Sequence, residues 1–183
     1  MTVTSAGGQV VATEHATITA AAPRFAVRVA DTPFTPGSYL VKVRLQGKAD
    51  VAADASEQVR IAVPDLSTAN APALGQAMVF RRGPFSGAGF QPTADPRFRK
   101  AERIRVDVPL AGAIESLTAQ LLDRKGQPLP VPVAAAQREE EGLRFATAEL
   151  ALAPLAPGDY LLEVAVRRGD RTEKVLVAFR IVP

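Results

Sequence analysis

Apolar and polar residues alternate along much of this 183-residue chain, and Pro and Gly interrupt the alternation at short intervals. In Ile104-Arg105-Val106-Asp107-Val108, the branched apolar residues share one face and the charged residues the other. A period of two is typical of strands with one face on a core and one face in water. Fifteen Pro and thirteen Gly leave few windows for a helix. The sequence therefore predicts an all-β protein.

An eleven-residue segment occurs twice in the chain. Residues 33–43 read PFTPGSYLVKV, and residues 154–164 read PLAPGDYLLEV, at a constant offset of 121. Two copies of one supersecondary unit predict two homologous domains. A small, polar, Pro-containing stretch between them is typical of a linker. We therefore expect one domain at 1–66, a linker at 67–75 and a second domain at 76–183.

The spacing of turn residues predicts seven strands in the second domain, at 76–82, 102–109, 116–123, 128–136, 143–152, 159–168 and 173–182. Hairpin turns are expected at 123–126, 139–142 and 168–170. This number of short strands is typical of a β-sandwich. The first domain shows five candidate strands, at 2–5, 9–20, 24–30, 38–46 and 57–63. Either it is a smaller sandwich or the chain begins inside a domain, and we favour the second interpretation.

Both copies of the repeat resemble the tyrosine corner of fibronectin type III domains, in which an L-x-P-G-x-Y segment leads into the next-to-last strand. Pro fixes φ of the turn, and the hydroxyls of Tyr39 and Tyr160 are expected to bond to backbone across the corner. The resemblance implies two tandem immunoglobulin-like or fibronectin type III-like antiparallel β-sandwiches. The Cys…Trp…Cys signature of antibody domains is missing, because the chain contains neither Cys nor Trp.

The second domain is also similar to the C-terminal regions of acidobacterial-type von Willebrand factor A-related proteins. The segments that carry this resemblance are FRRGP at 80–84, QPTADPRFRKAER at 91–103, LLDRKGQPL at 121–129 and AFRIVP at 178–183. The resemblance implies a secreted or cell-surface bacterial protein. The A domain itself is absent, since no Asp-x-Ser-x-Ser metal motif occurs. The N-terminus lacks the regions of a signal peptide, which predicts a cytoplasmic chain or a piece of a longer secreted protein.

Much of the positive charge lies between Phe80 and Arg105. This segment holds seven Arg and Lys against two acidic residues, whereas the whole chain carries +3. Long connections between strands are where sandwiches often carry binding sites. The candidate partner-binding residues are Arg81, Arg82, Phe85, Phe90, Arg97, Phe98, Arg99 and Lys100. The alternative, which we favour for this segment, is that the Phe side chains pin it to the core and the Arg side chains are merely solvated.

The residue inventory argues against catalysis. There is no Cys, His15 is the single histidine, and no nucleophile elbow or cofactor motif occurs, so we expect no enzyme, no cofactor and no metal. No nucleic-acid-binding signature accompanies the basic charge, and no apolar run is long enough for membrane insertion. We expect a non-catalytic interaction or adhesion module of a larger bacterial protein, with a protein or acidic glycan partner. The alternative is a structural spacer without a ligand.

Overall fold

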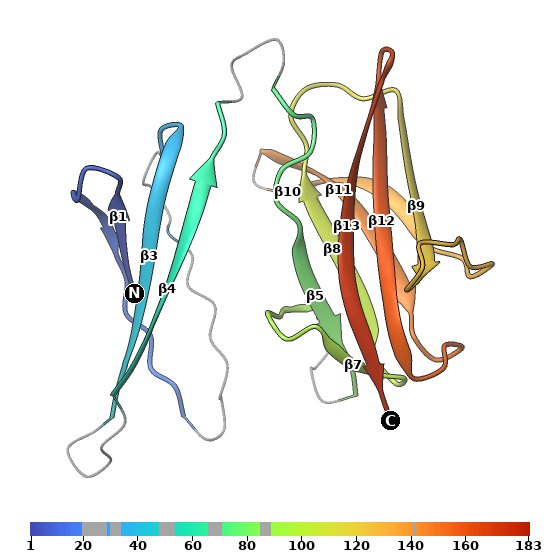
Figure 1. The fold of residues 1–183 in the computed structure, drawn as a ribbon, viewed down its shortest axis with the longest axis horizontal. Helices are drawn as coiled ribbons and strands as arrows, with labels where there is room; N and C mark the ends of the chain where they lie inside the picture. Colours follow the sequence, from blue (N-terminus) through green and yellow to red (C-terminus); the bar gives the residue numbers. More distant parts are fainter. Residues whose placement is uncertain (20–28, 30–33, 48–53, 66–70, 85–88, 141) are drawn as a thin grey trace. The chain divides into compact units, whose positions relative to one another are not determined.

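The protein divides into two compact units, Met1–Ala71 and Pro72–Pro183. The computed structural model describes residues 1–19, 29, 34–47, 54–65, 71–84, 89–140 and 142–183. Every regular element in these residues is a β-strand (Figure 1), which confirms the all-β prediction. The division between the units falls within the stretch 67–75, where the sequence predicts a linker.

The first unit forms one antiparallel sheet in the residues that the structure describes (Figure 1). Its strands are β1 (Thr2–Ser5), β2 (Val10–Thr13), β3 (Gly37–Gln46) and β4 (Asp54–Val63). They lie in the order β2-β1-β3-β4. The predicted strand at 24–30 lies outside the described residues, apart from Val29, which belongs to no strand.

The strand β2 is shorter than the strand predicted at 9–20. Its neighbour in the sheet is β1, with Thr13 opposite Thr2, and the N–H of Glu14 donates to the carbonyl of Met1. The ladder between β1 and β2 ends at this pair. A period-two pattern shows which residues are able to form a strand, but it does not show how long the neighbouring strand is.

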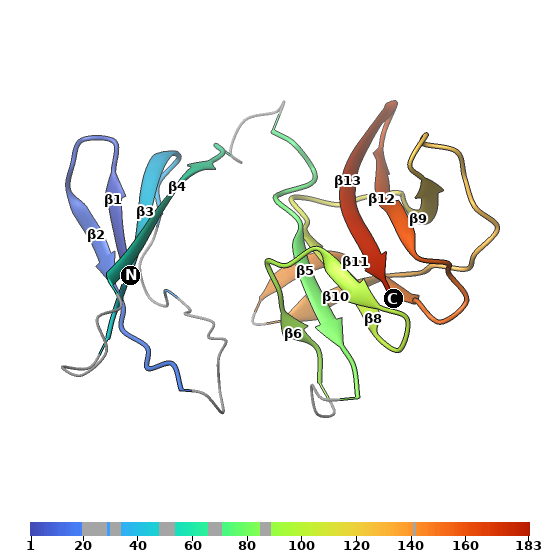
Figure 2. The same cartoon turned by 60° about the horizontal axis from the view of Figure 1, so that its bottom comes forward.

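The second unit is a β-sandwich. Its strands are β5 (Met78–Arg82), β6 (Gln91–Pro92), β7 (Arg97–Arg99), β8 (Arg103–Pro109), β9 (Ser116–Asp123), β10 (Ala134–Glu140), β11 (Leu143–Ala151), β12 (Gly158–Arg168) and β13 (Arg171–Val182). One sheet has the order β10-β11-β8-β5-β6 and the other has the order β7-β13-β12-β9. Figure 2 shows the two sheets as separate layers, and apolar side chains from both fill the space between them.

The alternation in the sequence puts every second side chain into this core. Ile104 and Val106 come from β8, Leu162 and Val164 come from β12, and all four are fully buried. Burying one such side chain stabilises a protein by about 1.5–3 kcal/mol. The short strand β7 adds Phe98, whose ring meets another core ring edge-to-face with the centroids 6.0 Å apart. The core therefore joins strands that are far apart in the sequence.

The largest departure from the predicted strands is at β10. The sequence predicts a strand at 128–136, whereas β10 begins only at Ala134. Pro130 and Pro132 explain the difference, because proline has no N–H to donate to a ladder. The apolar residues between and beside these prolines pack partly buried against the core from irregular backbone. The prediction recognised apolar residues that face inward but assigned them the wrong backbone structure.

The repeated segment forms the same bend in both units. Tyr160 lies near the start of β12, and its hydroxyl donates a 2.9 Å hydrogen bond to the carbonyl of Ala156. Tyr39 lies near the start of β3, and its hydroxyl donates a 2.7 Å hydrogen bond to the carbonyl of Thr35. In both cases the acceptor lies four residues earlier, on the other side of the Pro-Gly pair. The two tyrosines therefore occupy equivalent positions.

Replacing the tyrosine by phenylalanine keeps the ring and removes this hydrogen bond, and at Tyr39 it also removes a 3.1 Å hydrogen bond between the hydroxyls of Tyr39 and Thr35. We expect Tyr160→Phe to lower the free energy of unfolding of the second unit by about 1 kcal/mol, and Tyr39→Phe to do the same in the first unit. Amide hydrogen exchange, followed separately in each unit, measures the two changes. Each variant should leave the other unit unchanged, and equal protection in the variant and the parent would show that the bend does not depend on the hydroxyl.

Candidate partner-binding surfaces

The segment between Phe80 and Arg105 does not form one continuous surface. Of the eight candidate residues, Arg81 and Phe98 are buried. Arg82 and Phe90 lie together on the outer face of one sheet, and Arg97 lines a pocket on the other sheet. Arg99 and Lys100 are exposed. Phe85 lies outside the described residues. The candidate residues therefore have several different roles.

The structure contradicts a binding role for Arg81 and Phe98, because both side chains are buried. The guanidinium of Arg81 lies 4.7 Å from the centroid of the Phe98 ring. It donates hydrogen bonds of 2.9 and 2.8 Å to the carbonyls of Asp95 and Arg97, and it pairs with Glu102 at 3.3 Å. A buried cation needs such compensation. Arg81 thus fixes the loop that leads into β7, and Phe98 pins this loop to the core.

Arginine and phenylalanine side chains alternate on the outer face of the sheet that contains β5 and β8. The guanidinium carbon of Arg105 lies 4.7 Å from the ring centroids of both Phe80 and Phe90, and that of Arg82 lies 4.9 Å from Phe90. We call these four residues the arginine–phenylalanine ladder. A guanidinium is attracted to the face of an aromatic ring. The rings of the ladder are therefore already occupied by charges from the same unit.

A buried carboxylate stabilises the same face. Asp107 is fully buried, accepts hydrogen bonds of 2.8 Å from Arg138 and 2.9 Å from Thr147, and pairs with Arg105 at 3.2 Å. A buried charge is tolerated only with such partners. The sequence predicts a solvated outer face for β8, and this expectation is wrong for Asp107, because Arg138 from β10 and Thr147 from β11 cover it.

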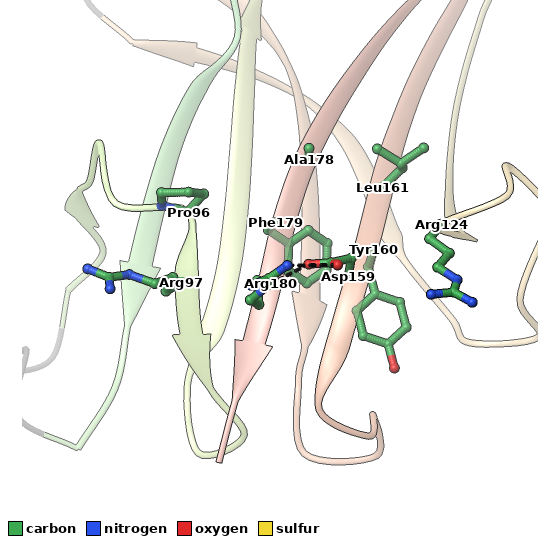
Figure 3. Close-up of a pocket in the computed structure, with 9 residues that line it drawn as sticks. All are labelled: Pro96, Arg97, Arg124, Asp159, Tyr160, Leu161, Ala178, Phe179 and Arg180. Atoms are coloured by element: carbon green, nitrogen blue, oxygen red, sulfur yellow. Dashed lines mark hydrogen bonds and ion pairs between the residues drawn. The ribbon is translucent and has the colours of Figure 1, made fainter.

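An open pocket of 490 Å³ lies on the outer face of the β7-β13-β12-β9 sheet (Figure 3). Leu161 of β12 and Ala178 of β13 are paired across the two strands and form an apolar floor. Arg97 borders the pocket on one side and Arg124 on the other, with Arg180 between them (Figure 3). The pocket thus combines apolar surface with three arginines.

Two of the three arginines are held in ion pairs. Arg180 pairs with Asp159 at 2.5 Å, and Arg97 pairs with Asp95 at 3.0 Å. Hydrogen bonds from these guanidinium groups lower the pKa of Asp159 and lower the pKa of Asp95 to about 2, so both carboxylates are ionised at neutral pH. Arg124 forms no hydrogen bond or ion pair with another described residue. Together with the hydrogen bonds that these carboxylates accept, its charge helps to lower the pKa of Asp123 and Asp159, but of the three arginines it is the one that no hydrogen bond to a described residue holds in place.

Apart from Arg97, and Tyr160 as the corner residue, the residues of this pocket were missed by the sequence prediction. Two signals for its floor were present, since Tyr160-Leu161-Leu162 and Val177-Ala178-Phe179 are each three apolar residues in a row. Such a run breaks the alternation and places one apolar side chain on the outer face of the strand. Arg124 and Asp159 carried no comparable signal, because they approach the floor only in the folded chain.

No group of three or more metal-ligating side chains occurs among the residues that the structure describes. Within the same residues, no helix is long and apolar enough to cross a membrane. His15, the single histidine, is exposed. The pocket of Figure 3 is therefore the surface feature that we consider for function.

No family model and no curated protein matches the chain. A solved structure of a DUF4426 family protein from Pseudomonas aeruginosa PAO1 is similar over 45% of this chain and 65% of that chain, at 19% identity and a TM-score of 0.32. The chain thus spans slightly less than two thirds of the length of that protein. A likeness at this level says nothing about a binding site.

The buried network around Asp107 predicts a large loss of stability when its carboxylate is removed. We expect Asp107→Ala to lower the free energy of unfolding of the second unit by about 3 kcal/mol, because the arginines around it lose their counter-charge. Asp170→Ala, in an exposed turn, is the matched control and should change stability by less than about 0.5 kcal/mol. Denaturant unfolding measures both variants. Equal stabilities of the two variants would contradict the proposed network.

The ion pair of Arg97 and Asp95 predicts an acid-dependent change. Because the pKa of Asp95 is lowered from 3.8 to about 2, its stabilising contribution is complete above pH 3.8 and is lost as the pH falls towards 2. Carboxyl carbon chemical shifts should therefore give Asp95 a midpoint near 2. In Arg97→Gln the midpoint should rise towards 3.8, and an unchanged midpoint would show that Arg97 does not stabilise the carboxylate.

Proposed function

We propose that the second unit is an immunoglobulin-like or fibronectin type III-like sandwich. The order β10-β11-β8-β5 corresponds to the four-stranded sheet of immunoglobulin domains, and β13-β12-β9 corresponds to the three-stranded sheet. The short β7 joins this second sheet parallel to β13. Tyr160 lies at the start of the next-to-last strand, as in the tyrosine corner of these domains. The matching bend at Tyr39 supports assigning the sheet of the first unit to one layer of such a sandwich.

We also propose that the chain is a non-catalytic interaction module of a larger bacterial surface or secreted protein. The observation that carries this proposal is the pocket with an apolar floor and the guanidinium of Arg124, which forms no hydrogen bond or ion pair with another described residue. Its floor belongs to two paired strands, so little ordering is needed when a partner binds. The surface or secreted context depends on the resemblance of the segments at 80–84, 91–103, 121–129 and 178–183 to von Willebrand factor A-related proteins.

The chemistry of the pocket favours an acidic protein segment as the partner. A carboxylate would form a charge-assisted hydrogen bond with Arg124. An apolar side chain next to this carboxylate would cover Leu161 and Ala178. An acidic glycan has no comparable apolar group and would leave these two side chains uncovered. We therefore favour a protein over a glycan.

The carboxylates beside the pocket suit binding better than proton transfer. Asp159 and Asp95 both have a lowered pKa because each accepts hydrogen bonds from an arginine. A general acid or base works best when its pKa lies near the working pH. At neutral pH these two groups are therefore weak bases held in ion pairs, which supports a non-catalytic role.

The second candidate function is a structural spacer without a ligand. It is favoured by the outer face of the β5–β8 sheet, where the arginine–phenylalanine ladder and Asp107 connect neighbouring strands. Such connected networks stiffen a domain. A spacer needs stiffness and no pocket, so a direct test of the pocket distinguishes the two functions.

A short peptide with a carboxylate between apolar residues tests the interaction module. Titration of isotope-labelled protein with N-acetyl-Leu-Glu-Leu amide should shift the amide signals of Leu161, Ala178 and Arg124. The peptide with Gln in place of Glu should bind about tenfold more weakly, because a hydrogen bond to a charged group contributes about 1.5–3 kcal/mol.

Arg124→Gln should weaken binding of the Glu peptide by the same factor of about ten. Lys125→Gln removes the same charge from the neighbouring exposed position and is the matched control, which should bind like the parent. Equal binding by the two variants would reject the role of Arg124. Absence of any shift in the pocket signals, with this peptide and with longer acidic peptides, would favour the spacer.

A further inference from the structure

The turn after β1 has the same structure as the turn after β9. In Ser5–Gln9 the N–H of Ser5 donates to the carbonyl of Gln9, and the N–H of Gly8 donates to the carbonyl of Ser5. Asp123, Gly126 and Gln127 make the same two bonds. The N–H of the last residue donates to the side-chain oxygen of the first in both turns, at 3.3 Å in one and 2.8 Å in the other. The glycines have matching left-handed φ values of 82° and 79°.

The strands around the two corner tyrosines pair in the same register. Tyr39 of β3 lies between Ser5 of β1 and Ile61 of β4. Tyr160 of β12 lies between Asp123 of β9 and Phe179 of β13. With the matching turns, this assigns β1, β3 and β4 to the places of β9, β12 and β13. The sheet of the first unit is thus a second copy of one layer of the sandwich.

The two copies differ in how much of their equivalent faces is covered along β4 and at the end of β3. Leu162, Val166 and Phe179 of the second unit are 0%, 2% and 3% exposed, because the other sheet lies on them. The residues at the corresponding places in the first unit are Val41, Leu45 and Ile61. Leu45 and Ile61 are 43% and 38% exposed, and Val59 on the same face is 52% exposed. Val3 and Tyr39 lie on the same side of the sheet and are buried, with 2% and 6% exposed, so we call only the exposed part of this side, at Leu45, Val59 and Ile61, the open face.

The open face differs from the covered face in one charge. Glu57 lies opposite Val43, at the place that Val175 occupies opposite Val164 in the second unit. Glu57 is exposed and forms no hydrogen bond or ion pair with another described residue. A partner that covers this face must therefore bring a positive charge to Glu57, because a buried unpaired carboxylate is strongly unfavourable. A second copy of the open face would bring another glutamate instead.

We propose that the open face is an interaction surface that binds an opposing pair of β-strands from a partner protein, which covers the part of this layer that the unit itself leaves exposed. The segment has the chemistry of β5 and β8, with alternating branched apolar residues turned towards the open face, and it carries a basic residue that reaches Glu57. The second unit supplies the precedent, since Ile104, Val106 and Val108 of β8 are buried in its core. Sheets pack about 10 Å apart through such side chains. This inference does not depend on the pocket in the second unit.

The second unit also provides the probe. A copy of residues 72–118 is joined in front of Met1, because these residues precede the place in β9 that corresponds to Met1. Amide hydrogen exchange of β3 and β4 should become at least about tenfold slower than in the unextended protein, since exchange follows local opening. The same extension with Ile104→Ser and Val106→Ser in the added copy is the control and should give no protection. Amides of the second unit report in both samples whether it stays folded.

A second variant tests the role of Glu57. In the extended protein, Glu57→Val should slow the exchange of β3 and β4 further, whereas Gln58→Val on the other face should not. Unchanged exchange in both extensions would overturn the proposal, and so would faster exchange of β3 and β4 while the second unit remains protected. A dimer of the unextended protein that Val59→Glu dissociates would also overturn it, because the occupant would then be a second copy.

Discussion

The hydrogen bond from each corner tyrosine to the carbonyl four residues earlier fixes how the chain enters β3 and β12, the strands that carry the repeated segment. A fixed entry point determines the register with the neighbouring strands, and a shift of one residue would turn every side chain to the opposite face. In the second unit this register turns Leu162 into the core and leaves Leu161 outside. The composition of the core and the floor of the pocket therefore depend on the same bend.

The charged side chains on the two outer faces of the sandwich differ in how completely they are paired within the unit. On one face, Asp107 is buried among arginine partners, and the rings of the ladder lie against guanidinium groups. On the other face, ion pairs hold Arg97 and Arg180, while Arg124 beside the apolar floor forms no hydrogen bond or ion pair with another described residue. A partner gains the most binding free energy where it can contact a charge and an apolar surface together. This difference places the proposed binding function on β12 and β13.

The sequence predicts the strands well where one face is apolar and the other is charged, as in β8 and β12. It fails at the start of β10. The residues around the prolines there face inward, but proline has no N–H to donate, so this stretch forms no continuous ladder of strand hydrogen bonds. It also fails for Arg81 and Phe98, because their burial depends on carbonyl groups and rings that meet only after folding. The pocket was missed for the same reason, since alternation assigns a residue to a face but does not identify its neighbours on adjacent strands.

Cross-strand proton contacts around the two tyrosines test the shared bend most directly. Nuclear Overhauser contacts between backbone protons should place Tyr39 opposite both Ser5 and Ile61. They should place Tyr160 opposite Asp123 and Phe179 in the same pattern. Agreement of the two patterns would establish that one bend organises both sheets. Contacts that pair Tyr39 with other residues, or with no strand on one of its sides, would contradict the account.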